Sequence, residues 1–295
     1  MMARILDGKK IARAVREEVA ADVRAAAARW GRRPGLAVVL AGSHPASQVY
    51  VGMKQRACAA AGIASFEHRL GDGAGELELL ELVAALNRDE RVDGILVQLP
   101  LPAGVDESRI LEAVDPLKDV DGFHPLNVGR LWRGEPCLVP CTPAGVIELL
   151  ARSGIPVEGR HAVIVGRSAV VGRPLAGLFL RKSPRGNATV TVCHSRTPDI
   201  GRVAAAADIL VAAIGRPRFI TADMVREGAV VIDVGINQVG ATPEGKRILV
   251  GDVDFEAVKE KAAAVTPVPG GVGPMTIAML MRNTLEAFRL RQELR

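Results

Sequence analysis

Aromatic residues are scarce in this chain. Its 295 residues include 2 Trp, 1 Tyr and 6 Phe, or 3% of the total. Proteins that bind nucleic acid by stacking bases combine basic clusters with aromatic side chains. The formal net charge is +5, yet no Lys/Arg cluster with interleaved aromatics is present. We expect an enzyme acting on small anionic molecules, with a non-enzymatic protein whose basic surface binds nucleic acid as the alternative from another class.

Cysteines and long apolar runs are also few. The four cysteines are Cys58, Cys137, Cys141 and Cys193, and none forms a Cys-x-x-Cys pair. Since a chain of this length can bury a core without disulfides, a reduced, cytoplasmic protein is expected. No run approaches the roughly 18 uncharged residues of a membrane span, so no membrane partner is expected. The first ten residues lack the apolar segment of a secretory signal.

The residues that are present favour a globular α/β protein. Hydrophobic residues make up 48% and charged residues 24%, and at roughly 150 residues per domain the length suggests two domains. Hydrophobic periodicity predicts helices at 9–30, 46–61 and 76–87, alternating with strands at 35–40, 65–70 and 92–99. Such alternation predicts a parallel sheet with right-handed crossovers.

A second α/β series follows residue 140. Thr142 as N-cap and Pro143 at the first helical position predict a helix to Leu150. The expected elements then are strands 161–165, 189–193, 209–214 and 229–234, with helices after 168, from 197 and over 221–226, and a terminal helix over 274–292. The predicted fold class is α/β, with two α/β domains flanking a cleft, the second a Rossmann-like parallel sheet.

Two segments beyond strand ends are candidate binding loops. The strand at 92–99 runs into Leu99-Pro100-Leu101-Pro102 and must end there, because proline cannot donate to a sheet ladder. The polar, turn-rich segment 115–125 then lies where ligands bind in α/β sheets. His124, His161 and His194 lack metal-ligand spacing, so structural roles and no metal are expected.

A glycine turn follows the strand at 161–165. Gly166-Arg167-Ser168 leads to Gly172 at a helix start, where free N–H groups would favour a pyrophosphate, although a purely structural turn explains the glycines as well. The next strand ends at Cys193 without the carboxylate that binds the ribose of NAD. Arg167 and Arg196 could instead neutralise a 2′-phosphate, which favours NADP; the alternative is two solvated surface arginines.

A second candidate group shares one face of the helix at 46–61. Ser47, Tyr50 and Lys54 are spaced by three and four residues. Gln98 ends a strand, and Asp121 lies in the polar loop that follows the next short helix. From these residues alone, a solvated lysine and a packed tyrosine are equally good interpretations.

Longer motifs resemble one family, in order and over nearly the whole chain. They are Pro45-Ala-Ser47-Gln-Val-Tyr50-Val-Gly-Met-Lys54, Asp93-Gly-Ile-Leu-Val-Gln98-Leu-Pro100-Leu-Pro102, Lys118-Asp-Val-Asp121-Gly-Phe, Pro140-Cys-Thr-Pro143-Ala-Gly, Gly166-Arg-Ser168, Asp233-Val-Gly-Ile-Asn237 and Thr266-Pro-Val-Pro-Gly270-Gly-Val-Gly273-Pro-Met-Thr276. The family is the bifunctional methylenetetrahydrofolate dehydrogenase/methenyltetrahydrofolate cyclohydrolase.

The resemblance implies two reactions. Hydride passes from 5,10-methylenetetrahydrofolate to NADP⁺, and water then opens the cationic methenyl product to 10-formyltetrahydrofolate, which supplies one-carbon units for purine and related biosynthesis. A dehydrogenase for another substrate, such as shikimate or an amino acid, is the alternative enzyme. The resemblance also implies a homodimer, a folate-binding domain over 1–140 joined by the terminal helix 274–295, and an NADP-binding domain over 141–273.

Site residues are implied in the same way. Lys54 matches the catalytic lysine, Tyr50 its aromatic neighbour, Gln98 the partner of the lysine and Asp121 the pterin anchor. Further substrate-binding positions are Ser47, Leu99, Pro100, Pro269, Gly270 and Gly271. Cofactor-binding positions are Gly166, Arg167, Ser168, Ser195, Arg196 and Ile236. One departure is the segment 181–187, which looks longer than usual and is expected to protrude as a surface loop.

Overall fold

The computed structural model describes residues 2–43, 45–242, 245 and 247–294. Contacts divide the chain into two compact units. The three-stranded unit comprises Arg13–Arg130, Glu135–Cys141 and Ile277–Arg295. The six-stranded unit comprises Met1–Ala12, Leu131–Gly134 and Thr142–Thr276. The domain boundaries expected from the sequence stay a prediction.

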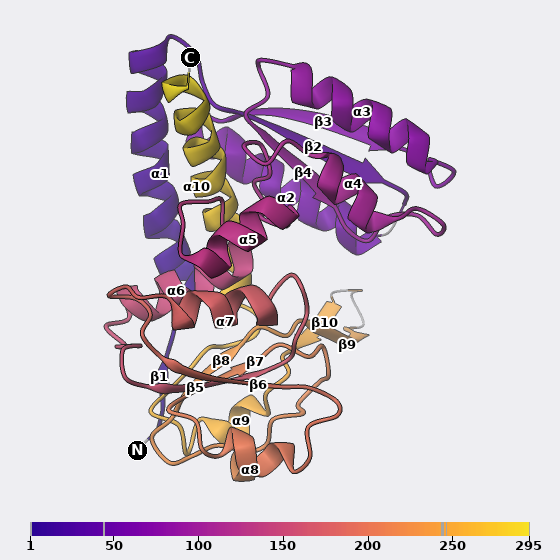
Figure 1. Ribbon diagram of the computed structural model, residues 1–295. Coiled ribbons are helices and arrows are strands. Elements are labelled where there is room, and N and C mark those ends of the chain that lie inside the picture. The colour runs from indigo at the N-terminus through magenta and orange to yellow at the C-terminus, as the bar shows by residue number, and fades with distance from the viewer. Residues whose placement is uncertain (1, 44, 243–244, 246, 295) are drawn as a thin grey trace. The chain divides into compact units, whose positions relative to one another are not determined.

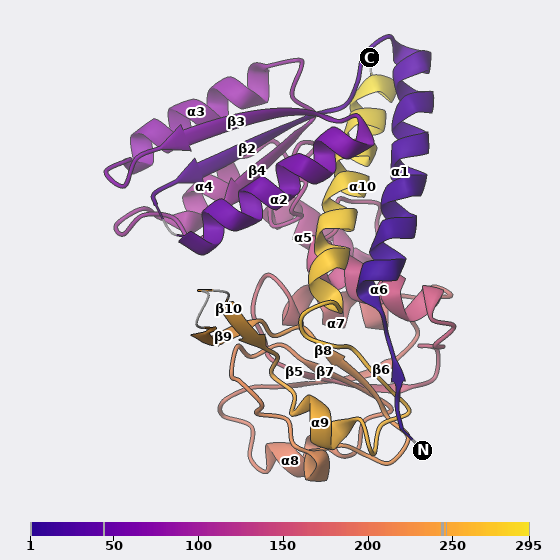
Figure 2. The ribbon, with the colours of Figure 1, turned by 180° about the vertical axis from the view of Figure 1, so that it is seen from behind.

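The three-stranded unit is built on a parallel sheet of order β3-β2-β4. Its strands are β2 (Gly35–Ala41), β3 (Ala64–Leu70) and β4 (Gly94–Gln98). Every residue of β2 is buried, which explains its unbroken apolar sequence, whereas the edge strand β3 alternates. Helices α3 (Glu76–Arg88) and α4 (Glu107–Ala113) pack on one face, and α2 (Pro45–Ala61) lies on the other, as Figures 1 and 2 show together.

Two long helices complete this unit. Helix α1 (Gly8–Trp30) ends at Gly31, whose φ of 70° confirms the expected left-handed cap. Helix α10 (Val272–Glu293) runs beside it in both views (Figures 1 and 2). The rings of Trp30 and Phe288 meet edge to face with centroids 5.5 Å apart. The C-terminal helix therefore returns to the first half of the chain, as predicted.

The six-stranded unit contains an all-parallel sheet of order β1-β11-β8-β7-β5-β6. Its strands are β1 (Arg4–Ile5), β5 (His161–Val165), β6 (Thr189–Cys193), β7 (Ile209–Ala212), β8 (Val230–Asp233) and β11 (Ala264–Val265). Helices α6 (Cys141–Arg152) and α7 (Gly172–Leu180) cover one face, and α8 (Ile200–Ala204) and α9 (Phe255–Val258) the other (Figure 1). This confirms the Rossmann-like parallel sheet.

Several elements were not predicted. They are β1, α9, β11, helix α5 (Pro125–Arg133), and the antiparallel pair β9 (Asn237–Ala241) and β10 (Arg247–Val250). The two-residue strands β1 and β11 and the one-turn helix α9 leave too short a hydrophobic pattern to recognise. Helix α5 has nine residues, but Leu131 is its only buried apolar residue, so its buried face offers no apolar spacing to recognise. The pair β9 and β10 is mostly exposed and so lacks an apolar face.

Three predicted helices differ in the structure: two begin at another residue, and one is a 3₁₀ turn. Helix α6 begins at Cys141, so Thr142 lies inside it, and its hydroxyl is 3.0 Å from that of Thr276. Helix α8 begins at Ile200, because the hydroxyl of Thr197 accepts a hydrogen bond from the backbone of His194 in a preceding turn. The expected helix at 221–226 is a single 3₁₀ turn, Ala222–Met224.

Other expectations concern surface and composition. In the segment 181–187, Arg185 pairs with the buried carboxylate of Glu148 at 2.7 Å and Gly186 is buried, so the loop is anchored rather than fully protruding. The four cysteines are free thiols. Across the described residues, no helix combines the length and hydropathy of a membrane span, and no group of three His, Cys, Asp or Glu side chains could hold a metal.

Candidate active site

Helix α2 brings Lys54 to the carboxyl end of β4. Ser47, Val51 and Cys58 form the buried stripe of this helix, at spacings of four and seven residues, and Lys54 lies within that stripe, partly buried. Its ammonium Nζ donates a 3.0 Å hydrogen bond to Oε1 of Gln98. The lysine is therefore not a solvated surface cap, which was the open alternative.

Gln98 is itself fixed in orientation. Its amide Nε2 donates to the carbonyl of Leu99 at 2.8 Å, which leaves Oε1 to accept from Lys54. The hydroxyl of Ser47 lies 3.4 Å from the same Leu99 carbonyl. The Leu99–Pro100 peptide bond is cis. The structure thus gathers Ser47, Lys54, Gln98 and Leu99 at one strand end, an arrangement that the family resemblance implied.

The polar loop after β4 is held by two charged residues that sequence reasoning passed over. Lys118 is buried, and its ammonium donates to the carbonyls of Leu86, Asn87 and Asp89, at 2.8 to 2.9 Å. These carbonyls belong to the C-terminal turn of α3 and the residue after it. The buried carboxylate of Asp119 accepts from the backbone N–H groups at 123 and 124 and from the amide of Asn127. Both residues stand inside the Lys118-Asp-Val-Asp121-Gly-Phe motif that carried the resemblance, and their place in that motif was the available signal.

Asp121 occupies the end of this fixed loop. Burial raises the pKa of its carboxyl to about 6, and the positive charge of Lys54 acts in the opposite direction. Gly122 follows with a φ of 70°, and a Cβ there would lie 2.6 Å from the backbone of Pro140. Only glycine fits this turn, which fixes the direction in which the chain leaves Asp121.

Cysteine thiols near the lysine are not alternative nucleophiles. Burial raises the pKa of the Cys58 thiol to about 12 and that of the Cys141 thiol well above its usual value. Cys141 donates to the carbonyl of Val120 at 3.3 Å, and the amide of Asn283 donates to the same carbonyl at 2.8 Å. These contacts hold the loop in place, and the thiolate forms are disfavoured. Sequence reasoning missed this role of Asn283.

Tyr50 is 36% exposed on α2, one turn before Lys54. A tyrosine packed in the core would have almost no exposed surface. It therefore offers an accessible aromatic surface beside the lysine, within the same unit.

The glycine turn lies at the carboxyl end of β5 in the six-stranded unit. Gly166 has a φ of 131°, and a Cβ there would lie 2.1 Å from the carbonyl of Ala213. A Cβ on Gly172 would lie 2.1 Å from the carbonyl of Gly166. Glycine is therefore needed at 172 because the helix start packs against the backbone of the turn. The hydroxyl of Ser168 accepts from the N–H of Val171 at 3.2 Å.

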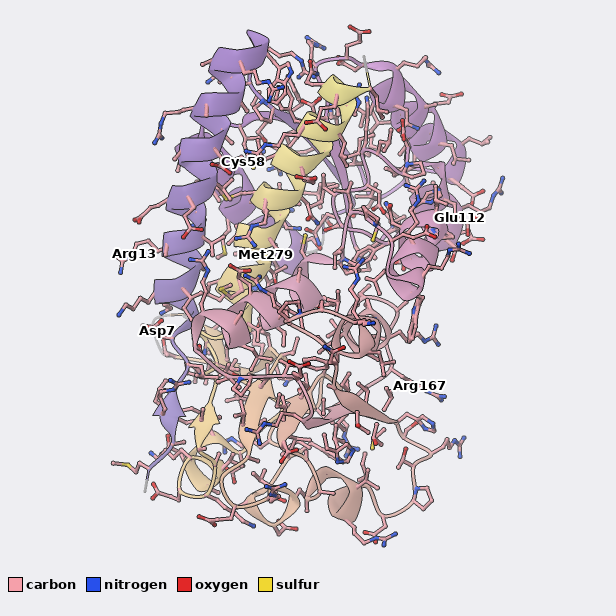
Figure 3. The ribbon with its side chains drawn as sticks, turned by 60° about the vertical axis from the view of Figure 1, so that its left-hand side comes forward. Asp7, Arg13, Cys58, Glu112, Arg167 and Met279 are labelled. Carbon is pink, nitrogen blue, oxygen red and sulfur yellow. The ribbon has the colours of Figure 1, made fainter. Side chains whose placement is uncertain are left out.

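A pocket of 300 Å³ opens beside this turn. Its lining combines the turn with the ends of β6 and β7: Val165, Gly166, Arg167, Ser168, His194, Ser195, Ile200, Ala213, Ile214, Arg216 and Phe219. Arg167 belongs to this lining but is exposed, and its side chain projects outward in Figure 3. Arg216, which sequence reasoning missed, lies over the ring of Phe219 at 4.6 Å. Arg196 and Ile236 are exposed and are not part of this lining.

Two carboxylates fix the loops that follow β7 and β8. Asp252 accepts from the N–H groups of Ile214 and Gly215, at 2.7 and 2.9 Å, and from the amide of Asn237. Burial raises the pKa of Asp233 to about 7, although N–H groups at 235, 252 and 253 all donate to its carboxyl and oppose that rise. Ile236 lies between Gly235, whose N–H donates to Asp233, and Asn237, whose amide donates to Asp252.

The segment expected to bind substrate near the terminal helix is a rigid turn. Gly270 has a φ of 118°, and its carbonyl accepts from the N–H of Lys9 at 3.0 Å. A Cβ on Gly271 would lie 2.7 Å from the carbonyl of Pro267. Pro269 follows a cis peptide bond. The structure shows why glycines stand here, while their contact with substrate stays a prediction.

Comparisons with known proteins identify the family of the chain. Residues 6–121 match the family described as tetrahydrofolate dehydrogenase/cyclohydrolase, catalytic domain, and residues 140–292 match its NAD(P)-binding domain. A protein from Dehalococcoides mccartyi (strain CBDB1), named Bifunctional protein FolD, is 61% identical, with 98% of each chain covered.

Solved structures are similar as well. The bifunctional enzyme FolD from Campylobacter jejuni has a TM-score of 0.92 at 46% identity, covering 98% of this chain and 99% of that one. The Trypanosoma brucei methylenetetrahydrofolate dehydrogenase-cyclohydrolase, solved with NADP and an inhibitor, has a TM-score of 0.93 at 40% identity, covering 99% of each chain. The alternative of a dehydrogenase from another family is therefore excluded: the chain belongs to the tetrahydrofolate dehydrogenase/cyclohydrolase family.

Proposed function

We propose that this protein oxidises 5,10-methylenetetrahydrofolate with NADP⁺ to the 5,10-methenyl form and hydrolyses that product to 10-formyltetrahydrofolate. The one-carbon units so formed serve purine and related biosynthesis. The observation that carries the proposal is Lys54, placed on the buried stripe of α2 and hydrogen-bonded to the uncharged amide of Gln98. The names of the similar proteins support both activities.

Lys54 is the proposed base of the hydrolytic step. A bound cationic substrate that excludes water favours the neutral amine over the ammonium, and Gln98 orients that amine without adding a charge. As the oxygen of water bonds to the methenyl carbon, a water proton passes to the Lys54 amine and a neutral carbinolamine forms. The carbinol hydroxyl then loses its remaining proton as the formyl C=O forms, one ring C–N bond breaks, and the released nitrogen takes up a proton.

The remaining folate contacts follow from the chemistry of the side chains. Asp121 is the proposed pterin anchor, since a carboxylate accepts from the amino group and the ring N–H together. The exposed ring of Tyr50 provides a flat surface for the folate rings. Further binding positions are Ser47, Leu99, Pro100, Pro269, Gly270 and Gly271.

The glycine turn fits a dinucleotide. Because a Cβ at Gly166 would meet the carbonyl of Ala213, only glycine allows this tight turn, and the 300 Å³ pocket combines the turn with basic and hydroxyl side chains. We assign NADP binding to Gly166, Arg167, Ser168, Ser195, Arg196 and Ile236. Bound NADP⁺ supplies the hydride acceptor. Because the strand before Ser195 ends without a carboxylate, Arg167 and Arg196 are proposed to bind the 2′-phosphate.

Three broader proposals accompany this assignment. Residues 1–140 with the terminal helix 274–295 form the folate-binding domain, and 141–273 form the NADP-binding domain. The protein is proposed to act in the cytoplasm as a homodimer. Light scattering that gives twice the mass of one chain would support the dimer, and the mass of one chain would exclude it.

A spectrophotometric assay with the purified protein tests the function. With 5,10-methylenetetrahydrofolate, we expect faster reduction of NADP⁺ than of NAD⁺, and separately added methenyl compound should be consumed. Salt-dependent binding of DNA or RNA without reduction of either nicotinamide would instead support the nucleic-acid alternative.

A further inference from the structure

A second hollow lies at the amino ends of the strands in the six-stranded unit, the opposite edge from the glycine turn. Its volume is 370 Å³. The lining comes from the residues at or just before the starts of β1, β5, β7, β8 and β11 and from the segment after α6: Arg4, Gly154, Ile155, Pro156, Arg160, Asp208, Ile209, Arg226, Gly228, Val230, Ala263 and Ala264. The proposed function assigns no role to any residue of this lining.

The hollow carries an excess of positive charge. Three arginines face one carboxylate, that of Asp208. This carboxylate already accepts from Nη1 of Arg226 at 2.7 Å and from the backbone N–H of His161 at 2.9 Å. The charges of the lining therefore sum to about +2: Arg160 and Arg226 both interact with Asp208, and Arg4 lies at the other end of the hollow.

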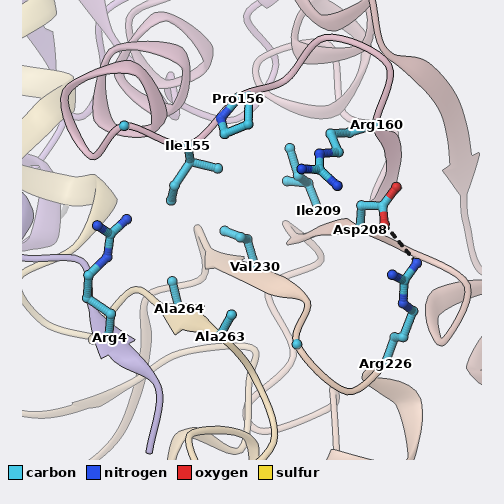
Figure 4. Close-up of a pocket in the computed structure, with 12 residues that line it drawn as sticks. Arg4, Ile155, Pro156, Arg160, Asp208, Ile209, Arg226, Val230, Ala263 and Ala264 are labelled. Carbon is cyan, nitrogen blue, oxygen red and sulfur yellow. Dashed lines mark hydrogen bonds and ion pairs between the residues drawn. The ribbon is translucent and has the colours of Figure 1, made fainter.

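The charges stand at two ends of an apolar floor. Figure 4 shows Arg4 on one side and Arg160 and Arg226 on the other, with Ile155, Val230 and Ala264 between them. Nη2 of Arg4 donates to the carbonyl of Ser153 at 2.7 Å, which orients the guanidinium and leaves further N–H groups for a ligand.

Backbone groups contribute little to recognition here. The N–H groups of Arg4, Val230 and Ala263 donate to carbonyls of residues just before neighbouring strands. Those of Gly154 and Ile155 donate to carbonyls at the end of α6, and those of Arg160 and Gly228 to carbonyls of nearby loops. A ligand would therefore be held by guanidinium groups at its ends and by apolar contact along its body.

From this arrangement we propose a second binding site, specific for a small organic dianion whose two anionic groups are separated by an apolar body. One anionic group pairs with Arg4 and the other with Arg160 and Arg226, so a monoanion of the same body fills only half of the site. The cofactor pocket lies at the other edge of the same sheet, and the two sites do not compete.

Isothermal titration calorimetry tests the proposal, with naphthalene-1,5-disulfonate as probe and saturating NADP⁺ present. We expect one saturable site per chain. Arg4→Gln and Arg160→Gln should each weaken binding about tenfold, as should replacing the probe by naphthalene-1-sulfonate. Arg202→Gln, which alters an exposed arginine of α8 outside the hollow, serves as the matched control and should bind as wild type does.

Three outcomes would overturn the proposal. They are no saturable binding, equal affinity in wild type and both variants, and loss of binding when NADP⁺ is added. Circular dichroism melting accompanies each variant. Should Arg4→Gln lower stability through loss of its bond to Ser153, Arg160→Gln still decides the question.

Discussion

The lysine site and the glycine turn achieve rigidity by different means. At the end of β4, side chains orient one another: Gln98 is fixed by Leu99 and in turn holds Lys54. At the end of β5, close backbone packing fixes the turn, because Gly166 approaches the carbonyl of Ala213 so closely that no side chain fits. The first arrangement suits a group that must move a proton, and the second suits a cradle for a phosphate.

The largest expected effect is on the side-chain site. Lys54→Met or Lys54→Ser should lower hydrolysis of the methenyl compound by a factor of about 10² to 10⁴, the usual contribution of a positioned base. Hydrolysis is followed with methenyl compound supplied directly, so the oxidation step does not interfere.

Gln55→Met is the matched control for this prediction. Gln55 neighbours Lys54 on α2 but contacts the exposed Glu67 instead. Gln55→Met should hydrolyse the methenyl compound at the wild-type rate. Gln55→Met and Lys54→Met should both have the melting temperature of the wild type. Full hydrolysis by Lys54→Met would remove the lysine from the mechanism.

The backbone site should fail through sterics. Gly166→Ala places a Cβ against a carbonyl at a φ of 131°, so the turn must shift. NADP⁺ affinity is expected to fall about 100-fold by calorimetry, with a lower melting temperature. Gly201→Ala in α8, where the added Cβ meets only ordinary contact at 3.6 Å, should leave affinity unchanged. An unchanged affinity in Gly166→Ala would disprove the cradle.

Asp121 should discriminate between the two ligands. Asp121→Asn is expected to weaken folate binding by a factor of about 10 to 100, the value of a charge-assisted pair, and NADP⁺ binding little. Equal losses for both ligands would count against a pterin anchor.

Acid should act on the same carboxyl. Because burial raises the pKa of Asp121 to about 6, its acceptor form is lost as the pH falls through that value. Wild-type folate affinity should therefore decrease below pH 6 and level off above it, while Asp121→Asn should lack this dependence.

The smallest effect concerns cofactor choice. Arg196→Ala should reduce the preference for NADP⁺ over NAD⁺ about tenfold, since one phosphate contact is lost. Arg167→Ala is the parallel variant from the pocket lining. If Arg196→Ala keeps the preference for NADP⁺ and Arg167→Ala loses it, the 2′-phosphate is bound at the glycine turn. Arg216, which also lines the pocket, would then be the next arginine to substitute.

The two sites also differ in how far the sequence reveals them. The strand, glycine turn and helix around Gly166 follow from local rules, and the parallel sheet was predicted from alternation. Lys54 and Gln98 are 44 residues apart, and no periodicity predicts that their side chains meet; the motifs that resemble the family supplied that expectation. Asn283 was missed because its partners at 120 and 139 are distant in sequence. The strand β1 was missed because two residues form no pattern.

The position of the Lys54 amine relative to bound folate tests the account most directly. A crystal structure with NADP⁺ and an unreactive folate analogue would measure the distance from Nζ to the atom at the one-carbon position. The account predicts that Nζ stays on Gln98 and reaches this atom directly or through one water, with heavy-atom steps of about 3 Å. An amine directed into bulk solvent, with the analogue bound elsewhere, would contradict it.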